Sequence, residues 1–192
     1  MREALFFYLY FFEMPLEKIL LSKHSKATTN EVIQWVGSDE EKFKLLMHFV
    51  LGENQILAQR AAWAMSYVVE EQPQFIYPYL NKLLTLVQTP VHAAIKRNTF
   101  RFLKEIEIPK KNLAKALDAC FAVVSNKKES IAVISFAFYT LIILSKKFPE
   151  IKNELLFAAD LQKEHTSKAL KNVIIKMRKA LVIPIIPTLN IK

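Results

Sequence analysis

The side chains that could act in catalysis or bind a metal are few and widely separated. The chain contains four histidines, His24, His48, His92 and His165. No two of them have H-x-x-x-H spacing, and the only cysteine, Cys120, offers no second thiol, so the short, fixed ligand spacings of a zinc site are absent. We expect no metal and no cofactor.

Nucleotide-binding loops and hydrolase motifs are also absent from the sequence. The chain has only 2 glycines in 192 residues, and it contains no phosphate-binding loop, dinucleotide fingerprint or G-x-S-x-G motif. The single aspartates Asp118 and Asp160 do not form a paired acid/base motif. We therefore expect no catalytic residue. An enzyme is the alternative, because residues distant in sequence can converge in a fold.

The better candidates are aromatic and basic side chains on predicted helices. Trp63 and Tyr67 are four residues apart and therefore share a helical face. Two sets of basic residues have similar helical spacings: Arg97, Arg101 and Lys104, and Lys168, Lys171 and Lys179. They could bind carboxylates or phosphates through charge. The candidate partner- or nucleic-acid-binding residues are Arg60, Trp63, Tyr67, Arg97, Arg101, Lys104, Lys168, Lys171 and Lys179.

Charge is distributed unevenly along the chain. Residues 1–95 carry 8 Lys/Arg and 10 Asp/Glu, a net charge of −2, whereas residues 96–192 carry 19 and 8, a net charge of +11. A basic half favours an anionic partner such as nucleic acid, an acidic protein surface or a lipid surface. The alternative is that these side chains only solvate the surface of a helical protein.

A repeat of about 37 residues determines which elements position these side chains. Trp63, Phe100 and Phe136 are 37 and 36 residues apart, and prolines punctuate the same period. Apolar residues recur at helical spacing, and no segment alternates as a strand would. A period of this length indicates stacked helix pairs. The predicted helices cover residues 16–23, 30–36, 39–51, 54–71, 74–88, 90–106, 109–125, 129–148, 149–161 and 167–182.

Polar residues with capping potential mark several predicted helix starts. Thr28 and Ser38 are each followed three residues later by a glutamate, which is the spacing of a capping box. Thr89 precedes Pro90 as a cap precedes a first-turn proline. Asn126 is the expected cap of the helix that follows it.

The paired helices, the repeat length and the stretch Arg60-Ala61-Ala62-Trp63 resemble HEAT-like (armadillo-type) repeats. More narrowly, the chain is similar to a group of small bacterial HEAT-like proteins that carry the same R-A-A-W stretch. The resemblance implies an all-α fold, a right-handed α-α superhelix of about four to five helix pairs. It implies that the second helix of each pair lines the concave face, and it implies no specific activity.

These observations favour a non-catalytic binding or scaffold module that holds an acidic or amphipathic protein segment on its concave face. The apolar stretch 131–144, between the two basic sets, suits a protein groove. The alternative is nucleic-acid binding through the basic C-terminal half. Some HEAT-like proteins resemble DNA alkylation glycosylases, which use a basic face, aromatic residues and a carboxylate. The only acids near Trp63 are Glu70 and Glu71 at the end of its helix.

Three segments are expected: an apolar N-terminal extension (1–13), a solenoid (14–183) and an extended C-terminal tail (184–192). Residues 4–12 are apolar but well short of the roughly 20 needed to span a bilayer, so we expect no membrane span. A single cysteine fits a reducing compartment, and we expect a cytoplasmic monomer, with a dimer as the alternative. Cys120 itself falls on an apolar helical stripe and is expected to be a buried structural thiol.

Overall fold

The computed structural model describes residues 15–164 and 167–182, and every regular element in these ranges is a helix. The all-α class predicted from the sequence is confirmed. The chain separates into two compact units, residues 1–115 (unit 1) and residues 116–192 (unit 2). The expected N-terminal extension (1–13) and C-terminal tail (184–192) lie outside the described residues.

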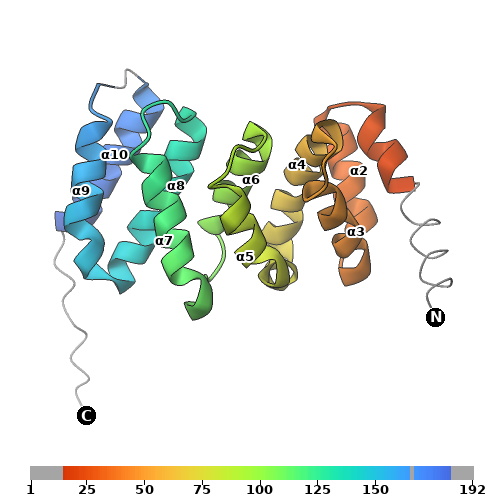
Figure 1. Ribbon diagram of the computed structural model, residues 1–192, viewed down its shortest axis with the longest axis horizontal. Coiled ribbons are helices and arrows are strands. Elements are labelled where there is room, and N and C mark those ends of the chain that lie inside the picture. The colour runs from red at the N-terminus through yellow and green to blue at the C-terminus, as the bar shows by residue number, and fades with distance from the viewer. Residues whose placement is uncertain (1–14, 165–166, 183–192) are drawn as a thin grey trace, which may run out of the picture. The chain divides into compact units, whose positions relative to one another are not determined.

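Unit 1 is built from helices that lie side by side in antiparallel pairs (Figure 1). Residues 15–22 form its first helix, and α4 packs against α2, α3 and α6. Large apolar side chains such as Phe43, Met65 and Phe100 are fully buried among these helices and form the core. The remaining elements are α2 (Lys26–Val36), α3 (Glu40–Val50), α4 (Gln55–Glu71), the 3-10 helix η1 (Pro73–Ile76), α5 (Tyr77–Leu86), α6 (Ala93–Leu103) and the first part of α7 (Lys110–Val124).

Unit 2 contains the rest of α7 and a second group of packed helices. These are α8 (Ile131–Lys147), the 3-10 helix η2 (Pro149–Ile151), α9 (Lys152–Leu161) and α10 (Lys168–Val182), and α10 packs against α8 and α9. The buried Gln162 side chain, just after α9, donates Nε2 to the Val124 carbonyl at 2.7 Å and so satisfies a free carbonyl at the end of α7. Cys120 on α7 is fully buried, as predicted, and burial raises the pKa of its thiol.

Two of the expected N-terminal caps are wrong. α2 begins earlier than predicted because Ser25, not Thr28, accepts the capping hydrogen bond, from the Thr28 amide at 3.2 Å. α6 begins at Ala93, not Pro90, because the Thr89 hydroxyl donates back to the Leu86 carbonyl at the end of α5. In each case the threonine hydroxyl instead bonds to the residue three positions earlier in the chain.

The other two predicted caps are displaced along the chain, by one residue for α3 and by four for α8. Asp39 rather than Ser38 caps α3 and accepts from the amides of Glu41 and Lys42 at 3.0 and 3.1 Å. Asn126 caps only the turn before α8, and the helix itself begins after Ser130, whose hydroxyl accepts from the Val133 amide at 3.4 Å. Within the described residues, no helix is both long and apolar enough to cross a bilayer.

Candidate partner-binding surfaces

The face of α4 that carries Trp63 and Tyr67 is partly open to solvent. Ala61 and Ala62 are fully buried, because their small side chains let α4 pack closely against its neighbours. Trp63 and Tyr67 point away from this packing and are half-buried, and Ile56 on the same face is 53% exposed. The predicted shared face is confirmed, and it presents aromatic and apolar surface.

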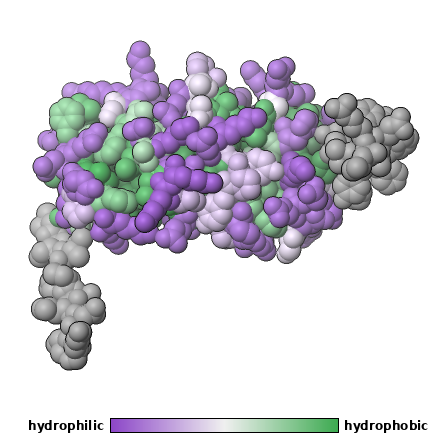
Figure 2. Space-filling view, turned by 60° about the horizontal axis from the view of Figure 1, so that its bottom comes forward, coloured by the Kyte–Doolittle hydropathy of each residue, from purple (hydrophilic) through white to green (hydrophobic). Residues whose placement is uncertain are grey.

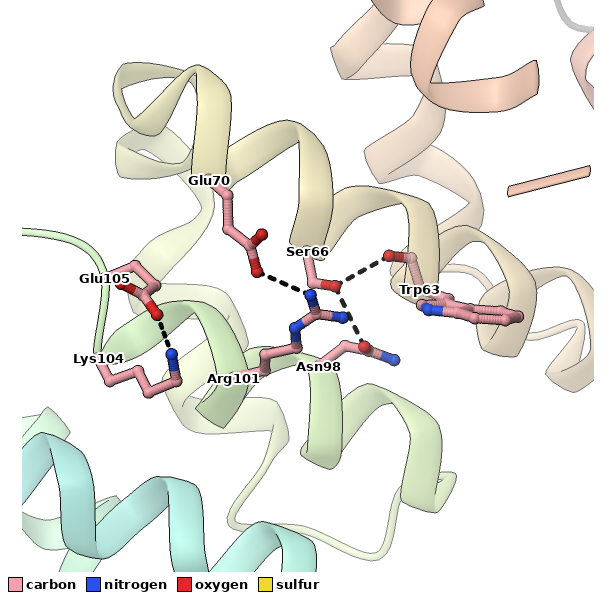
Figure 3. Close-up of polar contacts among 7 residues, drawn as sticks. All are labelled: Trp63, Ser66, Glu70, Asn98, Arg101, Lys104 and Glu105. Carbon is pink, nitrogen blue, oxygen red and sulfur yellow. Dashed lines mark hydrogen bonds and ion pairs between the residues drawn. The ribbon is translucent and has the colours of Figure 1, made fainter. Parts of the chain in front are cut away.

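Arg101 from α6 lies over Tyr67 and joins the two helices at the surface. Its guanidinium carbon is 3.9 Å from the centre of the Tyr67 ring. Its Nη2 is 3.0 Å from Oε1 of Glu70 on α4 (Figure 3). A hydrogen bond from Arg101 is the main cause that lowers the pKa of Tyr67, against the opposing effect of burial. The arginine is therefore held in one orientation by an aromatic face and a carboxylate.

A buried polar pair supports this surface from below. Ser66 on α4 and Asn98 on α6 are almost completely buried, and the Ser66 hydroxyl lies 3.2 Å from Asn98 Oδ1 and 2.9 Å from the Trp63 carbonyl (Figure 3). Asn98 also donates Nδ2 to the Ala94 carbonyl at 2.9 Å. The pair connects α4 to α6 through buried side chains and helps to set the register between the two helices.

Arg60 and Trp63 both contact the first helix pair. Arg60 donates Nη1 to the Leu20 carbonyl at 2.5 Å, which satisfies an end of the helix 15–22. The Trp63 ring packs on His24 with their centres 5.3 Å apart. Arg60 therefore has a structural contact, and its predicted role in partner binding stays a prediction.

The other two basic residues predicted on α6 differ in their availability. Arg97 is exposed and forms no ion pair within the described ranges, whereas Lys104 pairs with the neighbouring Glu105. Arg97, Arg101 and Lys104 all lie on the outward side of α6, because Thr99 and Phe100 occupy its buried side. Helical spacing therefore predicted the shared face correctly. It could not show which cations already have partners.

The three predicted lysines of α10 form a separate group in unit 2. Lys168, Lys171 and Lys179 are exposed, as is Lys176. Arg178 on the same helix instead pairs with Asp160 of α9, at 2.5 Å. The nine predicted residues thus fall into a six-residue set on α4 and α6 and a three-residue set on α10.

The apolar stretch 131–144, predicted to line a protein groove, is mostly core. Val133, Ile134, Phe138 and Leu141 of α8 are fully buried and cannot contact a partner. The outward side of α8 retains the half-buried Phe136, Tyr139 and Ile142, and Ile131 and Ile143 are 37% and 43% exposed. Figure 2 shows hydrophobic surface over unit 2, within hydrophilic surroundings.

Several features of these surfaces were not predicted from the sequence. The residues around Trp63 and Tyr67 that hold them, Ser66, Asn98 and His24, have no distinctive spacing. Ile175 of α10 is 51% exposed. The sequence could have indicated this exposure, because Ile175 is an isoleucine on the lysine-bearing side of an amphipathic helix. Among the described residues, no group of three or more His, Cys, Asp or Glu is placed to hold a metal.

Comparison with known proteins identifies the fold family. The model of a HEAT repeat domain matches residues 16–181, which is most of the chain. No curated protein and no solved structure matches. The paired helices of both units agree with that match, and the chain belongs to the HEAT repeat family.

Proposed function

We propose that this protein is a non-catalytic binding module that holds a protein partner through an acidic or amphipathic segment. HEAT repeats expose long helical surfaces whose side chains vary freely while the buried residues maintain the stack. A partner held on such a surface is recognised by the side chains that point outward. In unit 1 these include Trp63, Tyr67 and the arginines of α6.

The single observation that supports this best is Arg101, which is fixed over Tyr67 beside the half-buried Trp63. Trp, Tyr and Arg are the residues that contribute most to protein–protein binding when they are partly buried and well supported. An arginine that is already ordered loses less entropy when a partner binds. We call Trp63, Tyr67, Arg97 and Arg101 the aromatic–arginine surface.

The chemistry of this surface suggests what it binds. Ile56 and the two aromatic rings offer apolar contact, and the exposed Arg97 offers a guanidinium that can bind a carboxylate in a bidentate manner. A segment that carries both an apolar side chain and a carboxylate would satisfy both features. An amphipathic acidic helix or tail has this composition.

Nucleic-acid binding is the second candidate and is less well supported by unit 1. A phosphate track needs several free cations in succession, because its affinity comes mainly from the counterions they release. Arg60, Arg101 and Lys104 are already engaged with protein groups. Arg97 alone of the predicted cations on α4 and α6 forms no ion pair within the described ranges.

The test compares partner capture by the wild-type protein and the variant Trp63→Ala/Tyr67→Ala. Both proteins are immobilised and incubated with a cell lysate. The proteins that bind to each are quantified by mass spectrometry. We expect a set of proteins that the double variant loses and that the control Trp35→Ala keeps. Trp35 is a matched control, because it is a half-buried tryptophan on α2 of the same unit, beside Lys42 rather than Arg101.

A parallel titration separates the two candidate functions. Fluorescence anisotropy of labelled duplex DNA is followed as wild-type protein or Arg97→Ala is added at low and moderate salt. Identical capture by wild type and the double variant, together with DNA binding that Arg97→Ala weakens, would replace the protein-binding proposal with the nucleic-acid one.

A further inference from the structure

α10 carries four lysines that have no acidic partner in the part of the chain that the structure describes. Lys168, Lys171, Lys176 and Lys179 are exposed, and none forms an ion pair or side-chain hydrogen bond with a residue in 15–164 or 167–182. The helix contains no Asp or Glu, so it cannot neutralise these charges itself. An isolated row of like charges is unfavourable and gains most from an anionic partner.

Two acidic residues of unit 2 are already paired with cations. Asp160 binds Arg178 at 2.5 Å and Lys163 at 2.7 Å, and Glu164 binds Lys127 at 2.9 Å. Arg178 shows what an α10 cation does when a carboxylate is within reach. The four lysines have no such group among residues 15–164 and 167–182, so a partner that carries carboxylates would supply it.

Three of the lysines form a straight row that includes an apolar side chain. Lys168, Lys171, Ile175 and Lys179 follow the spacing i, i+3, i+7, i+11, which keeps them on one face of the helix. The row is about 16 Å long at 1.5 Å per residue. Ile175, near its middle, is 51% exposed, although the buried face of α10 already has Leu170, Val173 and Met177.

We propose that the row Lys168, Lys171, Ile175 and Lys179 is a docking site for an acidic amphipathic helix of a protein partner. Carboxylates on successive turns of that helix would pair with the lysines, and an apolar side chain between them would cover Ile175. This site lies in unit 2 and is separate from the aromatic–arginine surface, so either can fail without the other.

The isoleucine distinguishes this partner from other anions. A phosphate backbone would place charged groups along the whole row and would gain nothing from Ile175. A lipid surface would gain from apolar insertion, but one isoleucine among lysines offers far less apolar area than a membrane-binding helix. An acidic helix with an apolar side chain uses both kinds of contact.

The test uses a fluorescein-labelled synthetic helical peptide as the probe. It carries glutamates at i, i+3 and i+11 and a leucine at i+7, which match the spacing of the three lysines and Ile175, and a scrambled peptide keeps its composition but not its face. Binding to the full chain is measured by fluorescence anisotropy across a salt series. Duplex DNA and phosphatidylserine-containing vesicles are titrated under the same conditions.

Three variants locate the binding. Lys171→Glu/Lys179→Glu should weaken peptide binding by about tenfold or more, since two favourable pairs become repulsive. Ile175→Ser should weaken it about threefold and leave the salt dependence unchanged, because the lost contact is apolar. The control Lys128→Glu/Lys146→Glu makes the same charge change at exposed lysines of unit 2 that are not on α10, and should change affinity less than about twofold.

Several results would overturn the proposal. Absence of peptide binding at low salt would do so, as would equal binding of the scrambled peptide or equal losses in the α10 and control variants. Tighter binding of DNA or vesicles that depends on the same lysines would assign the row to phosphates instead. Circular dichroism of each variant checks that the helices are intact.

Discussion

The buried pair Ser66 and Asn98 gives the sharpest test of how α4 and α6 are held together. The Ser66 hydroxyl has one hydrogen, and it lies near two acceptors, the Trp63 carbonyl at 2.9 Å and Asn98 Oδ1 at 3.2 Å. Ser66 is fully buried and Asn98 is 6% exposed. Changing Ser66 to alanine removes little volume but takes a hydrogen-bond donor away from a buried amide oxygen.

The expected loss of stability follows from Asn98 Oδ1, which the change leaves without its donor. A buried acceptor left without its partner costs about 1–3 kcal/mol, whereas replacing both partners by apolar groups of similar shape is nearly neutral. Ser66→Ala should therefore destabilise unit 1 by about 1–3 kcal/mol. The double variant Ser66→Ala/Asn98→Leu should be more stable than Ser66→Ala alone, by about 1 kcal/mol, because no buried oxygen is then unpaired.

Urea denaturation followed by tryptophan fluorescence measures this directly. Both tryptophans, Trp35 and Trp63, lie in unit 1, so the signal reports on that unit. Thr29→Val is the control: it removes a buried hydroxyl whose acceptor, the Ser25 carbonyl, keeps the Thr29 amide as a donor, and should cost less than about 1 kcal/mol. A double variant as unstable as the sum of its single changes would refute the reasoning.

Two further predictions concern Tyr67 and the core of unit 2. Because Arg101 lowers the pKa of Tyr67, the folded protein releases that proton at lower pH than the unfolded chain, so this group's stabilising contribution is present above about pH 10 and is lost as pH falls through the lowered pKa. Ultraviolet titration of tyrosinate should find one tyrosine that ionises early, and Arg101→Met should raise its midpoint; an unchanged midpoint would contradict the contact. Phe138→Ala should cost about 3–5 kcal/mol because Phe138 is fully buried, whereas Phe157→Ala, at a residue 64% exposed, should cost less than about 0.5 kcal/mol. Circular dichroism during urea denaturation measures both, and similar losses would show that Phe157 packs against something in solution.

Local patterns predicted the helices well. Apolar spacing and prolines located every described helix, because both depend on residues within one or two turns. The starts were less accurate where two capping residues stood close together, as with Ser25 and Thr28 or Ser38 and Asp39. Which of them caps a helix depends on the turn before it.

The repeat spacing was a poor guide to equivalence between helices. Trp63, Phe100 and Phe136 are almost evenly spaced in sequence, but Phe100 is fully buried and the other two are half-buried. Each connecting loop sets the rotation of the helix that follows it. The loop before α6, for example, delays the start of that helix to Ala93. Equal spacing therefore did not place these residues on the same face.

The candidate surfaces were predictable one helix at a time. The shared face of Arg97, Arg101 and Lys104 followed from helical spacing alone. The contact of Arg101 with Tyr67 and Glu70 did not, because it depends on the register between α4 and α6. Only tertiary packing separates a cation that is engaged from one that is available.

The burial of Cys120 makes the protein convenient for site-specific labelling. Its thiol is fully enclosed and its pKa is raised, so alkylating reagents find neither access nor thiolate at neutral pH. A cysteine introduced at an exposed position, such as Ala169 beside the lysine row of α10, would be the reactive thiol. A fluorophore or spin label placed there could report on a bound partner without replacement of the native residue.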